Sequence, residues 1–220
     1  MLFRSIYRVR VLGEFPKGGD LQFIPASLVE QAQARYYRED AFSFAPVVLG
    51  VDVAAFGGDR CVVFLRQGLY SELLWTGREV ETATLAGVVA RFEDERKADA
   101  VFVDSTGVGF GVASNLRQMG RSPIAVDFAS APTHTAYLNK RAECWGLLRD
   151  WLKEGGWLPK DDRLRDDLCA PEYGYTLAGK IQLERKEKMR ARGLASPDLA
   201  NALARLWRSE ERRVGKECRS

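Results

Sequence analysis

Two short apolar runs that each end in an aspartate constrain the fold of this chain more than any other feature. The first run is Val47–Asp52 and the second is Ala100–Asp104. Both are rich in β-branched residues, which is typical of buried strands. An aspartate at the end of a buried strand must pair or bind a cation, because an isolated charge is costly to bury. The sequence therefore predicts two central strands whose acidic ends belong to a polar site.

A third aspartate, Asp198, follows Ser196 and Pro197, which are typical of the start of a helix. Acids at two strand ends and at one helix start can meet at one rim of a sheet. Two-metal nucleases need several carboxylates in one place, because divalent cations about 4 Å apart would otherwise repel each other. Each aspartate alone is more simply explained as a cap or turn residue. Taken jointly, Asp52, Asp104 and Asp198 are candidate catalytic residues and metal ligands.

The segments after residue 46 predict the fold, because strand and helix patterns follow one another in a recognisable order. Strands are expected over 47–53, 61–66 and 69–76, followed by a helix, a strand, a helix and a strand over 82–97, 100–104, 108–119 and 124–127. Three antiparallel strands followed by two parallel ones are the order of a ribonuclease H-like fold. We therefore predict an α/β protein with a mixed five-stranded sheet flanked by helices.

Elements outside this sheet are also visible in the pattern. Apolar residues at helical spacing predict a helix over 139–154, and a short helix is expected over 25–37. Residues 173–177 and 181–184 are expected to pair as a hairpin, and 197–207 to form the last helix.

Five motifs occur in an order that resembles a known family. They are Gly50-Val51-Asp52, Val103-Asp104-Ser105-Thr106-Gly107, Asn139-Lys140-Arg141-Ala142-Glu143, Gly179-Lys180-Ile181-Gln182-Leu183-Glu184 and Ser196-Pro197-Asp198-Leu199-Ala200. Together they resemble the C-terminal nuclease domain of large terminase subunits of tailed phages, over roughly residues 6–207. The resemblance implies a ribonuclease H-like endonuclease that cuts double-stranded, concatemeric viral DNA during genome packaging, with two Mg²⁺ or Mn²⁺ ions.

The resemblance also implies a role for each acid. Asp52 would be the first-strand acid that contacts both metal ions, Asp104 the fourth-strand acid, and Asp198 the acid at the start of the last helix. The family more often has a second acid three residues after the last one, where this chain has Asn201. Asparagine is a neutral and weaker oxygen ligand. Asn201 is therefore a candidate metal ligand and also the weak point of the expected site.

A basic run begins at the turn of the predicted hairpin and continues toward the last helix. Clustered lysine and arginine side chains can bind the DNA backbone even in a chain without net charge. The candidate DNA-binding residues are Lys180, Lys186, Lys188 and Arg190. The alternative is a solvated helix face, because Glu184 and Glu187 are interleaved with them.

The two ends of the chain are expected to be foreign to the fold. Residues 1–5 and 208–220 read like translated sequencing-adapter DNA, which should be excluded from fold reasoning. They hold six of the 33 basic and three of the 30 acidic residues, so the rest of the chain is neutral. Overall charge therefore gives no support for nucleic-acid binding. We expect residues 6–46 to be a linker segment from a missing motor domain and 47–207 to be the nuclease domain.

The expected partners follow from the resemblance. They are double-stranded DNA, the portal protein, the small terminase subunit and the ATPase domain of the full-length chain. No phosphate-binding P-loop occurs in the sequence, so the motor is not expected in this chain. We expect a phage or prophage protein in the host cytoplasm, without membrane association. Two alternatives remain: a nucleotide-binding fragment of the actin and sugar-kinase type, and a catalytically weak assembly module.

Overall fold

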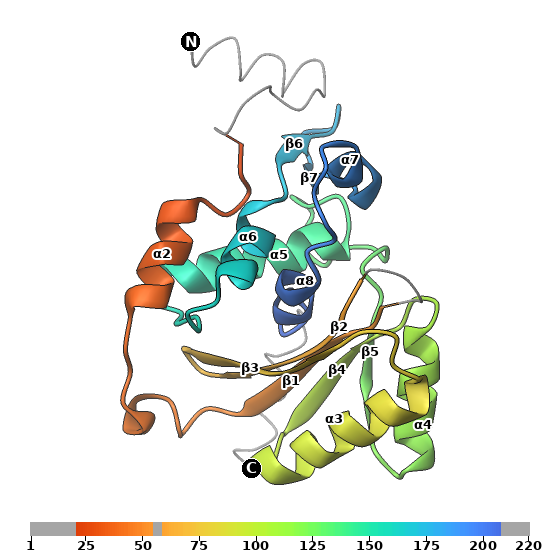
Figure 1. The fold of residues 1–220 in the computed structure, drawn as a ribbon. Coiled ribbons are helices and arrows are strands. Elements are labelled where there is room, and N and C mark those ends of the chain that lie inside the picture. Colours follow the sequence, from red (N-terminus) through yellow and green to blue (C-terminus); the bar gives the residue numbers. More distant parts are fainter. Residues whose placement is uncertain (1–20, 55–58, 208–220) are drawn as a thin grey trace.

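A twisted five-stranded sheet forms the centre of the protein (Figure 1). The computed structural model describes residues 21–54 and 59–207. The strand order is β3-β2-β1-β4-β5, with β1 antiparallel to β2, β2 antiparallel to β3, and β1, β4 and β5 parallel. The bounds are β1 (Val47–Asp52), β2 (Cys61–Gln67), β3 (Tyr70–Gly77), β4 (Ala100–Asp104) and β5 (Ile124–Val126). The mixed sheet predicted from the sequence is confirmed.

Helices cover both faces of this sheet (Figure 1). One face carries α3 (Thr82–Arg96) and α4 (Gly109–Gln118). On the other face α8 (Asp198–Ala204) packs directly on β1 and β2. Behind α8 lie α5 (Lys140–Lys153), α6 (Asp162–Cys169) and α2 (Ala26–Ala34). The strands β1, β2 and β4 are therefore buried on both sides.

Alternation along the strands decides where the two strand-end acids lie. Leu49 and Val51 belong to the core on the α3 and α4 side, whereas Val48 belongs to the core around α8. Successive strand side chains point to opposite faces, so Asp52 shares the face of Val48. In β4 the same argument places Asp104 on the face of Phe102. Both acids therefore point toward α8.

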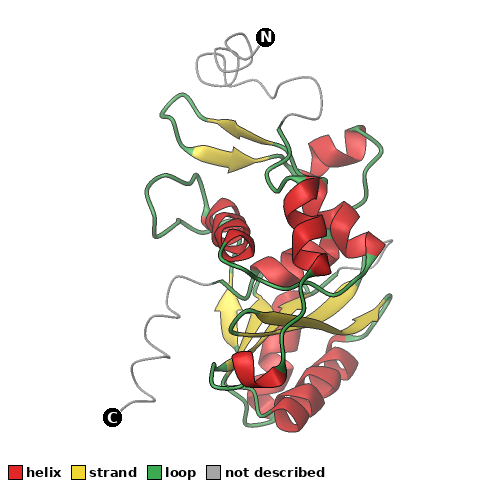
Figure 2. Cartoon of the chain, turned by 90° about the vertical axis from the view of Figure 1, so that its left-hand side faces the viewer, coloured by secondary structure: helices red, strands yellow, loops and turns green. Residues whose placement is uncertain are grey.

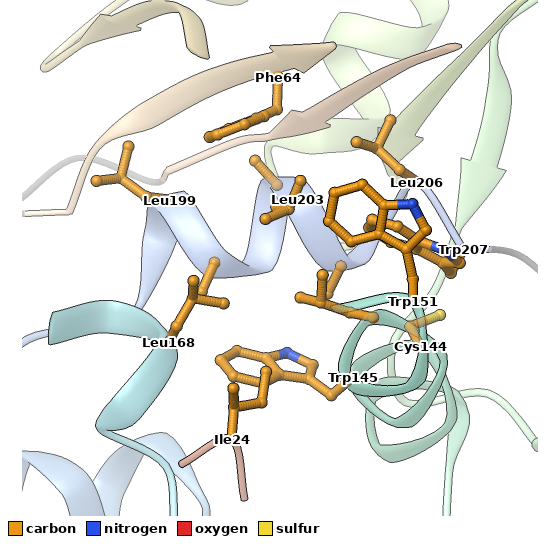
Figure 3. Close-up of a cluster of buried hydrophobic side chains, with 14 of the residues drawn as sticks. Ile24, Phe64, Cys144, Trp145, Trp151, Leu168, Leu199, Leu203, Leu206 and Trp207 are labelled. Atoms are coloured by element: carbon orange, nitrogen blue, oxygen red, sulfur yellow. The ribbon is translucent and has the colours of Figure 1, made fainter. Parts of the chain in front are cut away.

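The core around α8 holds this helix against the sheet (Figure 3). Leu203 of α8 is fully buried between Phe64 of β2 and Trp145 of α5. Gly50 permits the close approach, because a Cβ atom there would lie only 2.4 Å from the carbonyl oxygen of Ala202. The glycine of the Gly50-Val51-Asp52 motif thus has a packing role: it brings α8 next to the acidic end of β1.

The segment before β1 is part of the same core. Phe23 and Val29 are buried, and the amide of Phe23 donates a hydrogen bond to the carbonyl oxygen of Pro171. Helix α2 ends at Ala34, three residues before the predicted end, because Arg35 adopts an extended backbone. The Arg35 guanidinium then donates to the carbonyl oxygens of Leu152 and Gly156. Residues 21–46 therefore pack on the domain, although the boundary at residue 46 stays a prediction.

Three smaller elements complete the described chain. A hairpin of β6 (Tyr173–Tyr175) and β7 (Ile181–Leu183) stands beyond the helical layer (Figure 2), near α7 (Lys186–Ala191). A 3₁₀ turn, η1 (Glu39–Ala41), precedes β1. The adapter-like segments 1–5 and 208–220 lie outside the described residues. Within residues 21–54 and 59–207, every helix is too short or too polar to cross a membrane.

Candidate functional site

Asp52 and Asp104 end neighbouring parallel strands and lie side by side. The strands are in register at Val51 and Val103, the residues that precede them. Asp52 is 4% exposed and Asp104 is 6% exposed. Asp104 Oδ1 accepts hydrogen bonds from the amide and the hydroxyl of Thr106, at 3.0 and 2.8 Å. The loop after β4 therefore fixes the orientation of the Asp104 carboxylate.

Arg205, which the sequence reasoning missed, joins these two acids. Its Nη2 lies 2.8 Å from Asp52 Oδ1 and 2.8 Å from Asp104 Oδ2, and its Nε lies 3.1 Å from Asp52 Oδ1. The signal was an arginine among apolar residues, seven positions after Asp198 and hence on the same helix face. The two carboxylates are thus gathered around a single buried cation.

Asp198 approaches the same rim from the first residue of α8. It is 6% exposed, and its Oδ2 accepts a hydrogen bond of 2.7 Å from the amide of Arg60. Arg60 precedes β2 by one residue, and Val62 of β2 pairs with Asp52. All three predicted acids therefore lie around one end of the sheet. Among the described residues, however, no three acidic, histidine or cysteine side chains stand close enough together to hold a metal ion.

The electrostatics of this rim favour a cation. Burial is the main cause that raises the pKa of Asp52 to about 6; the negative charges of Asp104 and Asp198 contribute to this rise, and Arg205 and Lys186 oppose it. Burial also raises the pKa of Asp198. Both effects penalise the ionised carboxylates. A divalent cation bound here would offset the burial and the mutual repulsion together.

Asn201, the fourth predicted metal ligand, is engaged elsewhere. It is 1% exposed, and its Oδ1 accepts a hydrogen bond of 3.3 Å from the indole Nε1 of Trp145 on α5. In this arrangement the amide oxygen of Asn201 is directed to Trp145 of α5 and not to Asp52. Metal ligation by Asn201 stays a prediction, and the bond to Trp145 weighs against it.

The predicted DNA-binding residues lie at different distances from the acids. Lys186 begins α7, and its charge lowers the pKa of both Asp52 and Asp198, so it lies within electrostatic reach of the rim. Lys188 and Arg190 are exposed on the same helix, and Arg190 Nη2 is 3.4 Å from Asp59 Oδ2. Lys180 precedes β7 on the hairpin. Of the four predicted DNA-binding residues, Lys186 is therefore the one whose charge acts on Asp52 and Asp198.

A half-buried acid, Asp167 of α6, was also missed by the sequence reasoning. Its Oδ2 accepts a hydrogen bond of 2.9 Å from the amide of Leu199, which lies in the first turn of α8. Burial raises the pKa of Asp167 to about 7. Asp167 also lines a cavity of about 270 Å³ beside Asp198, together with Arg60 and Arg78. Asp167 therefore positions α8, and with it Asp198.

Comparison with known proteins identifies which fold this chain has. No protein-family profile and no curated protein matches the sequence. Among solved structures, the nuclease domain of the large terminase subunit gp2 of bacterial virus Sf6 aligns with a TM-score of 0.69. The alignment covers 84% of this chain and 97% of that chain, at 20% identity. This chain has the fold of a phage terminase nuclease domain.

Further solved structures support the assignment of this chain to the terminase nuclease fold. The large terminase nuclease from thermophilic phage G20c, solved with bound magnesium, aligns with a TM-score of 0.62 at 18% identity. The match covers 86% of this chain and 97% of that chain. A mutant Sf6 nuclease domain with manganese aligns with a TM-score of 0.69 at 19% identity. The fold implied by the five sequence motifs is thus confirmed.

The acidic side chains at the rim of this terminase nuclease fold are of the chemical type that binds divalent ions. Carboxylate oxygens are the ligands that Mg²⁺ and Mn²⁺ prefer, and Asp52, Asp104 and Asp198 supply them at one buried rim. Arg205 already contacts one oxygen of Asp52 and one of Asp104. An ion shared by these two acids therefore competes with the guanidinium.

Proposed function

We propose that this chain is a metal-dependent endonuclease that cuts double-stranded, concatemeric viral DNA during phage genome packaging. The observation that carries the proposal is the set of three buried acids at one rim of a terminase nuclease fold. Similar nuclease domains were solved with bound magnesium and with manganese. They support Mg²⁺ or Mn²⁺ as the cofactor. That the site holds two ions is part of the proposal.

In this proposal each residue has a separate task. Asp52 and Asp104 hold the ions, and Thr106 fixes the Asp104 carboxylate. Asp198 completes the ligand set from α8, where the Arg60 amide orients its carboxylate. When bound, the metal ions supply an activated water and stabilise the leaving oxygen of the phosphodiester. The protein contributes a rim at which Thr106 and the Arg60 amide orient the carboxylates of Asp104 and Asp198.

Lys186, Lys188, Arg190 and Lys180 are proposed to bind the DNA backbone. Lys186 carries the strongest support, since it is the one whose charge acts on both Asp52 and Asp198 among the described residues. A lysine beside the metal ligands would hold a phosphate next to them. Such contacts carry no sequence information and weaken with salt.

The domain arrangement and the partners belong to the same proposal. Residues 47–207 would be the nuclease domain, and residues 6–46 the segment that joins it to an ATPase domain of the full-length chain. The portal protein and the small terminase subunit would be its partners in packaging. The place of action would be the host cytoplasm. The motifs and the fold support these assignments.

Plasmid nicking tests the proposal. The wild-type protein is incubated with supercoiled plasmid and Mn²⁺, and the relaxed and linear products are measured. We expect Asp52→Asn and Asp104→Asn to lower the rate by a factor on the order of 100 or more, as the loss of a metal ligand does. Asp127→Asn is the matched control, because Asp127 follows β5 at the same edge and bonds only within its own loop among the described residues. Full activity in either ligand variant would contradict the mechanism.

A catalytically weak assembly module remains the second candidate. Two observations favour it: Arg205 contacts two of the acids, and Asn201 is bonded to Trp145. A metal titration separates the candidates, because two sites support catalysis whereas one or none supports the module. The actin and sugar-kinase type is not favoured, since the matched solved structures are nuclease domains.

A further inference from the structure

Arg205 is an unusual side chain for the place it occupies. It is 3% exposed and caps the end of α8, whose residues from Leu199 to Ala204 are apolar except Asn201. Arginine is almost never fully buried unless it is paired. Here the partners are two acids that the proposed function assigns to metal ions, Asp52 and Asp104.

The guanidinium is held from several sides. Besides its contacts with the two acids, Nη1 donates a hydrogen bond of 3.0 Å to the carbonyl oxygen of Val126. The guanidinium carbon lies 3.9 Å from the centre of the Phe128 ring. Arg205 therefore joins the ends of β1, β4 and β5 at once. It is a buried side chain with partners on three strands and not a surface arginine.

Arg205 and a divalent ion need the same oxygen atoms. Nη2 lies between Asp52 Oδ1 and Asp104 Oδ2, at 2.8 Å from each. An ion shared by these two carboxylates would occupy the same space, and like charges a few ångströms apart repel strongly even at the effective dielectric of a protein. Asp198 is different, because its carboxylate accepts a hydrogen bond from the Arg60 amide, whereas the ion pairs of Arg205 are with Asp52 and Asp104.

We propose that Arg205 is a resident cation that competes with divalent metal ions for the Asp52–Asp104 pair. The protein then binds a metal ion between these acids only when the guanidinium withdraws, so Arg205 sets the metal affinity of the site and the number of ions it holds. The inference rests on the proposed function, in which these acids are metal ligands. It adds a built-in restraint on that site, contributed by the helix that also carries Asp198.

Metal binding tests the competition without any nuclease assay. Mn²⁺ binding to the wild type and to Arg205→Met is measured by isothermal titration calorimetry in the absence of DNA. Methionine keeps an unbranched apolar stem and removes the charge. We expect Arg205→Met to bind Mn²⁺ more tightly by about tenfold or more, because a competing charge in contact with both ligands is gone. An additional Mn²⁺ site per protein is also expected.

Thermal unfolding gives a second readout and guards against misfolding. Without Mn²⁺, Arg205→Met is expected to melt below the wild type, because two buried acids lose their partner. Saturating Mn²⁺ is expected to raise its melting temperature by more than it raises that of the wild type. Arg205→Lys, which keeps a charge but has no planar fork, decides the outcome if Arg205→Met does not fold. For Arg205→Lys we expect Mn²⁺ affinity between those of the other two proteins.

Arg35→Met is the matched control. Arg35 is held by the carbonyl oxygens of Leu152 and Gly156, remote from the acids in the described contacts, so its loss lowers the melting temperature but leaves Mn²⁺ affinity unchanged. Unchanged or weaker Mn²⁺ binding in both Arg205 variants would overturn the inference. Failure of the proposed function looks different: tight Mn²⁺ binding in Arg205→Met, with no nicking by any protein, would leave the competition intact.

Discussion

The contact between Gly50 and α8 offers a sharp test of how the fold builds the site. In Gly50→Ala the new Cβ would lie 2.4 Å from the Ala202 carbonyl oxygen and 2.9 Å from Leu206 Cγ. Ordinary contact begins at 3.4 Å, so α8 must move away from β1 by about 1 Å. Arg205, on the same helix, would then lose its 2.8 Å contacts with Asp52 and Asp104.

The size of the effect follows from overpacking. Inserting a methyl group into a packed core costs about 1–3 kcal/mol, and for a chain of this length that lowers the melting temperature by roughly 2–12 °C. The assay is thermal unfolding followed by tryptophan fluorescence, since Trp145 and Trp151 lie in the core around α8. The nicking rate is expected to fall as well, because Asp198 moves with the helix.

Gly87→Ala is the matched control for this substitution. Gly87 is exposed in α3, and a Cβ there would meet nothing within 4 Å. The same chemical change should therefore raise stability by up to about 1 kcal/mol, through helix propensity alone. If Gly50→Ala melted at or above the wild-type temperature, the argument that Gly50 seats α8 would be refuted.

Two further predictions concern charge. The pKa of Asp167 is about 7 in the folded protein, above its ordinary value of 3.8. The contribution of the protonated Asp167 to the stability of the folded state is therefore complete below about pH 4 and is lost as the pH rises toward 7. In Asp167→Asn the melting temperature should fall less steeply over that range, and an unchanged profile would show that Asp167 does not titrate there. For DNA binding, Lys186→Gln should lower the slope of log affinity against log salt concentration by about one. Lys153→Gln, an exposed lysine of α5, should leave this slope unchanged, and equal slopes in both variants would remove Lys186 from the DNA contact.

The sequence predicted the sheet because its strands leave strong local signals. Val47–Asp52 and Ala100–Asp104 are continuous apolar runs, and buried strands of this kind are readable without knowledge of their neighbours. Arg205 could not be found in this way, because an arginine on a helix is usually exposed. Its role depends on α8 crossing β1 at Gly50, which is a tertiary contact.

The end of α2 and the partner of Asn201 show the same limit. Helical propensity alone predicted that α2 continues to Tyr37. The backbone of Arg35 is extended instead, and its guanidinium donates to the carbonyl oxygens of Leu152, near the end of α5, and of Gly156, after α5. Asn201 has the spacing of a ligand relative to Asp198, yet the indole of Trp145 engages its amide oxygen. Both outcomes depend on groups more than 50 positions away in the sequence: a backbone carbonyl for Arg35 and an indole for Asn201.

The central claim is that Asp52, Asp104 and Asp198 hold divalent metal ions, and crystals grown with Mn²⁺ test it most directly. An anomalous difference map collected near the manganese absorption edge locates the ions without reference to any assay. We expect a peak in contact with the carboxylates of Asp52 and Asp198, and a second peak beside Asp104 in crystals of Arg205→Met. A map without a peak at this rim, or with Mn²⁺ bound only elsewhere on the surface, would contradict it.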